Sequence, residues 1–215
     1  GATSFEKFPS ITVRDFKPDG LIRPSLRKPA FQRETNHWSP AQVVSLLECF
    51  INGDLIPSVI IWKSPTFFFV IDGGHRLSAI RAWVEDDYGD GPTSRSFFGD
   101  IISKEQKKAA VKTRDLVAEK IGTWQHFQSN LDNQKLEDRE RRRITTVVSR
   151  GIPVQWVEGN AEKAEASFFK INTQGTALDD IEELLLSNRR RPIAIAWRAV
   201  IRAGMGHRYW SKCSP

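Results

Sequence analysis

The chain has 215 residues, of which 40% are hydrophobic and 10% aromatic, and its formal net charge is +6. This composition supports a folded core, excludes a disordered chain, and contains no apolar run of the ~20 residues that a membrane-spanning helix needs. The excess of Lys and Arg favours a polyanionic partner. The first residues show no apolar leader pattern, and Cys49 and Cys213 lack metal-ligand spacing. We therefore expect a cytoplasmic protein with reduced thiols.

Strands and helices alternate in the first part of the chain. A short strand is expected at residues 11–13. Ser39, Pro40 and Gln42 predict the N-cap, the first residue and the capping box of a helix, and Gly53 suits its C-terminal end. Further along, the periodicity predicts strands at 59–62 and 67–71, paired as a hairpin, and a helix at 75–84.

The stretch at residues 85–92 is acidic and contains glycine. It lacks the spacing of an EF-hand calcium loop, so we expect an ordinary solvated loop there. The remaining predicted elements are helices at 104–121, 131–150, 161–171, 179–188 and 193–203, and a strand at 152–157.

These elements predict an α+β fold, in which a small mixed sheet carries packed helices and the C-terminal half is helical. We expect residues 1–158 to form a core with a helical insertion at about 103–150, and residues 159–215 to form a helical extension. Aromatic residues continue up to Trp210, so we also expect a fragment that is truncated before a further C-terminal region.

The most informative segment is FFFVIDGGHRLSAI, residues 67–80. An aromatic and β-branched strand leads into a turn with two glycines, Gly73 and Gly74, and then into a helix. The N–H groups of the first helical turn carry the positive end of the helix dipole. With His75 and Arg76 beside them, they favour a site for an anion such as phosphate. The alternative is a plain turn whose arginine faces water.

Four patterns follow one another between residues of about 30 and 185. They are Phe31-Gln32-Arg33 with Trp38, Gly53-Asp54-Leu55-Ile56-Pro57, Asp72-Gly73-Gly74-His75-Arg76-Leu77, and Phe168-Phe169-Lys170-Ile171-Asn172-Thr173-Gln174-Gly175-Thr176-Ala177-Leu178. In this order they resemble the ParB/sulfiredoxin-like N-terminal domain of GmrSD-type modification-dependent restriction enzymes, which SspE-like defence nucleases also carry. The third pattern corresponds to the D-G-Q-Q-R-L motif of that family. The resemblance implies a ParB/sulfiredoxin-like fold that binds a nucleoside triphosphate.

The resemblance also implies roles for individual residues. The residues that would bind nucleotide or phosphate are Gln32, Arg33, Gly73, Gly74, His75, Arg76, Ser78, Asn172, Thr173 and Gly175. Asp72 would be a catalytic carboxylate or a ligand of Mg²⁺, and His75 would assist hydrolysis. Plainer alternatives stay open: Asp72 could cap the helix that follows it, and residues 172–175 could cap a helix end.

The chain departs from the family pattern at Gly74 and His75, which replace both glutamines of the motif. A glutamine can orient the water that attacks a phosphate, so binding is better supported here than hydrolysis. Gly74 also stands where sulfiredoxin carries its cysteine, which excludes sulfiredoxin chemistry. We expect an NTP-binding regulatory domain of a modification-sensing anti-phage nuclease, with hydrolysis left open and ATP, GTP and CTP not distinguished.

The expected partners are a nucleoside triphosphate with Mg²⁺, DNA with or without a modification, and a C-terminal nuclease region or partner subunit. A homo-oligomer is left open. The alternative function is a non-enzymatic ParB-like module in which the turn at residues 73–76 grips a DNA phosphate. The arginine clusters at 139–143 and 189–191 are candidate DNA contacts, although solvated helix faces would explain them equally well.

Overall fold

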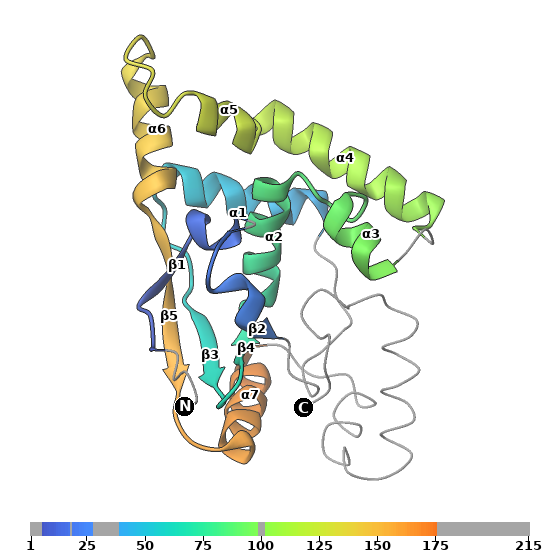
Figure 1. Cartoon of the computed structure of the whole chain (residues 1–215), viewed down its shortest axis with the longest axis vertical. Coiled ribbons are helices and arrows are strands. Elements are labelled where there is room, and N and C mark those ends of the chain that lie inside the picture. The colour runs from blue at the N-terminus through green and yellow to red at the C-terminus, as the bar shows by residue number, and fades with distance from the viewer. Residues whose placement is uncertain (1–5, 18, 28–38, 99–101, 176–215) are drawn as a thin grey trace.

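The computed structural model describes residues 6–17, 19–27, 39–98 and 102–175. Within these residues the fold is α+β, as the sequence predicts, with a five-stranded mixed sheet and helices packed against it (Figure 1). The strands are β1 (Ser10–Thr12), β2 (Leu26–Arg27), β3 (Val59–Lys63), β4 (Phe68–Asp72) and β5 (Gly151–Val157). Their order across the sheet is β1-β5-β3-β4-β2.

The centre of the sheet is the predicted hairpin of β3 and β4, which pair antiparallel. β5 lies parallel to β3 on the other side, and β1 lies antiparallel to β5. β2 adds a parallel edge next to β4. The sequence did not predict β2, because a strand of two residues is too short to show periodicity.

The helices in the described part of the chain are α1 (Pro40–Asn52), α2 (Gly74–Glu85), α3 (Pro92–Phe98), α4 (Lys104–Lys120), α5 (Trp124–Ser129), α6 (Asp138–Ser149) and α7 (Ala161–Gly175). Two short 3-10 turns are η1 (Val13–Phe16) and η2 (Arg23–Ser25). Figure 1 shows α4 and α5 along one end of the molecule and α7 at the opposite end.

The predicted start and end of α1 are confirmed. The Ser39 hydroxyl accepts a hydrogen bond from the N–H of Gln42, and the Gln42 side chain accepts one from the N–H of Ser39. Gly53 ends the helix in the left-handed conformation, with φ of 76°. At the start of α7, the Asn160 side chain accepts a hydrogen bond from the N–H of Lys163 and so caps the helix.

Alternation along the strands gives the sheet two covered faces. Val59 and Val70 belong to the main core, together with residues of α1 and α2. On the other face Ile71 packs against Ala164 and Phe168 of α7. Because both faces are covered, β4 is an unbroken apolar run that ends at its first charged residue, Asp72.

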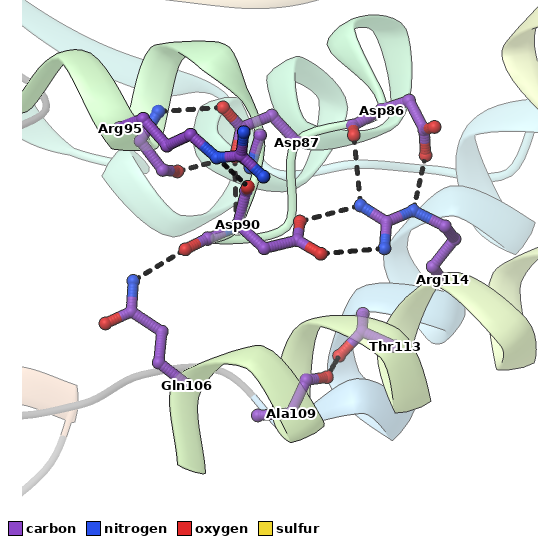
Figure 2. A network of polar contacts seen from close by, with 11 residues as sticks. Asp86, Asp87, Asp90, Arg95, Gln106, Ala109, Thr113 and Arg114 are labelled. Atoms are coloured by element: carbon purple, nitrogen blue, oxygen red, sulfur yellow. Dashed lines mark hydrogen bonds and ion pairs between the residues drawn. The ribbon is translucent and has the colours of Figure 1, made fainter. Parts of the chain in front are cut away.

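The acidic stretch after α2 differs from the prediction of an ordinary solvated loop. Asp87 is fully buried and accepts hydrogen bonds from the N–H groups of Gly89, Gly91 and Ser94 and from the Ser94 hydroxyl (Figure 2). Its carboxylate therefore organises the turn into α3. The expectation was wrong because acidic composition does not distinguish a solvated carboxylate from one that binds backbone N–H groups.

The neighbouring carboxylates connect this loop to α4. The Arg114 guanidinium binds Asp86 through Nε at 2.8 Å and Asp90 through Nη2 at 2.7 Å (Figure 2). Gln106 donates to the carbonyl oxygen of Gly89. These contacts attach the loop between α2 and α3 to α4.

Most predicted boundaries shift by one residue or more. β1 covers residues 10–12 in place of 11–13, and it ends at Thr12 because the Asp15 carboxylate binds the N–H of Thr12 and turns the chain into η1. The helix predicted at 131–150 begins only at Asp138, since Asn133 bonds to Asn130 and to the N–H of Lys135 and keeps the preceding residues in turns. α7 continues beyond the predicted residue 171. The helices predicted at 179–188 and 193–203 lie outside the described residues.

Candidate functional site: the glycine turn between β4 and α2

The turn that joins β4 to α2 depends on a glycine at residue 73. Gly73 is the N-cap of α2 and has φ of 97°, a left-handed conformation that residues with a Cβ rarely adopt. A Cβ placed there would lie 2.9 Å from Cγ2 of Val59 and 3.0 Å from Nη2 of Arg76. The backbone of this turn therefore passes directly over the start of β3.

A β-bulge precedes the turn. Ile60 lies opposite Asp72, whereas Ile61 lies opposite Val70, so Ile71 is the extra residue on β4. Bulges bend a strand and redirect the side chains that follow. Here the bulge sets the direction of Asp72, the last residue of the strand.

The Arg76 guanidinium is folded back onto the turn. Its Nη2 donates to the carbonyl oxygen of Ser58 and to Oδ2 of Asp72, both at 3.0 Å. The side chain is only 16% exposed, and its Nε is buried without a hydrogen-bond partner. The alternative of an arginine that simply faces water is therefore wrong.

Asp72 faces Arg76 and leaves the helix start uncapped by its side chain. Gly73 occupies the N-cap position, and the hydrogen bond of the Asp72 carboxylate is with Arg76. The alternative in which Asp72 caps α2 is thus wrong. Its side chain is 40% exposed, so one carboxylate stays accessible beside the turn.

The first turn of α2 carries the remaining predicted residues of this segment. Leu77 donates a hydrogen bond to the carbonyl of Gly73 at 3.1 Å, which closes the first turn of the helix. Gly74 and Ser78 share a helix face, and both His75 and Ser78 are half-buried. The structure thus brings together six of the predicted site residues, namely Asp72, Gly73, Gly74, His75, Arg76 and Ser78.

The other predicted site residues are not placed in this cluster. Gln32 and Arg33 lie outside the described residues. Asn172, Thr173 and Gly175 form the last turn of α7, and their side chains lie outside the described part of the structure. Their assignment to the site stays a prediction.

Sequence reasoning missed two residues that shape the turn, Ser58 and Val59. Ser58 supplies the carbonyl that holds Arg76, and Val59 fills the space beneath Gly73. The predicted hairpin contained the signal, because antiparallel pairing brings the start of β3 beside the end of β4.

The predicted Mg²⁺ ligand, Asp72, does not belong to a cluster of metal-binding side chains in the described part of the chain. Among the described residues no group of three or more His, Cys, Asp or Glu side chains could hold a metal ion. Mg²⁺ is commonly held by one or two carboxylates and by substrate phosphates. Asp72 therefore fits an ion that arrives with a triphosphate, and it does not form a protein cage for one.

The described structure thus shows an α+β domain with a strand–glycine–helix turn at the end of a central strand. The family model for the N-terminal domain of GmrSD restriction endonucleases matches residues 18–189. The chain therefore belongs to this family, which is part of a restriction and defence system. Searches of curated proteins and of solved structures found no match. No helix among the described residues is long and apolar enough to cross a membrane.

Proposed function

We propose that this domain binds a nucleoside triphosphate at the glycine turn and passes the state of that site to the nuclease region of the restriction enzyme. The observation that carries the proposal is the turn itself, where a left-handed Gly73 leads directly into the first turn of α2. The positive end of the helix dipole favours a phosphate at such a position.

Arg76 supports the proposal because it is fixed in advance. The carbonyl of Ser58 and the carboxylate of Asp72 hold its Nη2, while Nε is buried without a partner. A guanidinium held in place loses little conformational freedom when it binds an anion. A phosphate that paired with Arg76 would compete with Asp72 and release that carboxylate toward Mg²⁺ carried by the triphosphate.

The decisive experiment titrates the protein with ATP, GTP and CTP in the presence of Mg²⁺ by calorimetry. We expect micromolar binding of at least one triphosphate. Arg76→Ala should weaken that binding at least tenfold, because a hydrogen bond to a charged group contributes about 1.5–3 kcal/mol. Measuring phosphate release would then separate a nucleotide-binding switch from an NTPase.

Arg143 provides a matched control. Its guanidinium also binds one carbonyl, that of Ile121, and one carboxylate, that of Glu140, but it lies on α6. Arg143→Ala should lower stability by a similar amount and leave nucleotide affinity unchanged. If wild type binds none of the three triphosphates, the proposal fails. A DNA-phosphate module would then be the better interpretation of the turn.

A further inference from the structure

The outward face of α4 carries a row of lysines. Lys104, Lys108 and Lys112 follow one another at intervals of four residues, so they are neighbours along one side of the helix. All three are exposed, as is Lys107 on the flank of the row. The opposite side, which includes Val117, is buried and packs against the rest of the domain.

No ion pair with an acidic side chain among the described residues holds this row, although Glu105 and Asp115 lie three residues from Lys108 and Lys112, respectively. Within that part of the chain, no carboxylate lies within ion-pair distance of Lys104, Lys108 or Lys112. Arg114, on the same helix, is different because Asp86 and Asp90 both bind it (Figure 2). Arg114 therefore forms ion pairs that connect α4 to the loop after α2, whereas the three lysines of the row form none with the described carboxylates.

The row is also placed where it disfavours the helix. Lys104 and Lys108, and likewise Lys108 and Lys112, are like charges at spacing i, i+4, and the two lysines of each pair repel each other. They occupy the first half of α4, where the helix dipole is already positive and Glu105 is the one acidic residue, whereas Asp115 and Glu119 lie in the second half. Both effects are unfavourable to folding, and both are relieved when an external polyanion covers the row.

The shape of the surface agrees with a large ligand. A shallow depression of about 550 Å³ on this face is lined by Lys107, Lys108 and Lys112, and further along the helix by Val111, Asp115, Leu116 and Glu119. Four residues of α-helix rise about 6 Å, so the row offers regularly spaced cations along an open surface. Such an array suits a repeating anion better than a single small one.

We propose that this lysine row on α4 binds the phosphate backbone of duplex DNA. The chain belongs to a restriction endonuclease family, so DNA is the polyanion that the whole enzyme meets. Contacts to phosphates position a protein on DNA without reading its sequence. This surface is independent of the glycine turn, so its test does not depend on nucleotide binding.

The α6 arginines are the weaker candidate for this role. Arg139 and Arg142 are exposed, but they alternate with Glu137, Asp138 and Glu140 along the same helix. Two other arginines of α6 are paired within the helix, Arg141 with Asp138 and Arg143 with Glu140, and we assign the contact to α4.

The proposal is tested by the charge reversal Lys108→Glu. Binding of a fluorescent duplex of about 20 base pairs is measured by anisotropy at several salt concentrations between about 50 and 200 mM. The variant should bind about tenfold more weakly at intermediate salt, and the slope of log affinity against log salt should fall by about one. The same loss is expected for duplexes of unrelated sequence.

The same substitution should make the domain more stable. Lys108→Glu removes both repulsive pairs and places a carboxylate between Lys104 and Lys112, so the unfolding temperature should rise by about 1–3 °C. Weaker DNA binding can then not be attributed to unfolding.

Lys120→Glu is the matched control, because it makes the same charge change on the same helix at an exposed position outside the row. It should reduce DNA affinity far less than Lys108→Glu. The proposal is overturned if wild type does not bind duplex DNA, or if the two variants lose affinity equally. The second result would mean that only net charge matters.

Discussion

Gly73 is the residue on which the geometry of the glycine turn depends most directly. Gly73→Ala should lower the free energy of unfolding by about 2–4 kcal/mol, because the left-handed conformation costs about 1–2 kcal/mol with a Cβ and the new methyl group would overlap Val59. Urea denaturation measures the loss.

Gly53→Ala separates the cost of the left-handed backbone from the cost of the overlap with Val59. Gly53 has a similar positive φ, but its Cβ would meet only Thr146, at an ordinary contact distance of 3.7 Å. It should therefore lose only the backbone part. Equal losses in the two variants would show that the close approach to Val59 does not constrain the turn.

At the scale of an element, Asp87 determines how the chain leaves α2 and enters α3. Burial by itself raises the pKa of this carboxyl, but the hydrogen bonds from Ser94, Gly89 and Gly91 outweigh that effect and lower the pKa below its ordinary value of 3.8. A carboxyl whose pKa is lower in the folded state stabilises the fold above the unfolded value. That contribution is lost as the pH falls through 3.8 toward the folded pKa.

We therefore expect wild-type stability to fall between about pH 5 and pH 3, and Asp87→Asn to show a weaker dependence over this range. At neutral pH the variant should be less stable by about 2 kcal/mol, since an amide NH₂ would face N–H donors in a buried site. Urea unfolding at a series of pH values measures both effects.

Asp86→Asn is the control for this prediction. The Asp86 side chain is 73% exposed, and its loss weakens only a surface contact with Arg114. A variant at Asp87 that followed the wild-type pH dependence would rule out the role of its carboxylate.

At the scale of the whole molecule, the sheet separates a large core from a small one. The small core joins α7 to β4 and β5 through Ile71, Ala164 and Phe168. Phe168→Ala should lower the free energy of unfolding by about 3–5 kcal/mol, because a fully buried aromatic ring is removed. Phe169→Ala, at a half-buried neighbour, should cost clearly less. Denaturation curves that show equal losses would contradict the assignment of Phe168 to the second core.

Local patterns predicted most of the strands and helices and the glycine turn, but not the short elements β2, α3 and α5, and they did not predict contacts between distant segments. The cap at Ser39 and the apolar strand β4 could be predicted because each depends on a few residues that are adjacent in the sequence. The partners of Arg76 and the burial of Asp87 depend on how separate segments meet. The same limit applies to the position of β5, because a parallel strand shows no sequence signal for its neighbour.

The arrangement of β1 and β5 has a consequence for the order in which the protein is made. Ile11 pairs with Ile152, and among the described strands β1 has no partner except β5. During synthesis the N-terminal strand must therefore wait until most of the domain has left the ribosome, and until then one side of β3 also stays open. Such late pairing slows folding and exposes strand edges to other chains. A nascent chain interrupted before residue 151 would leave both edges uncovered, so the sheet becomes complete only when nearly all of the described domain has emerged.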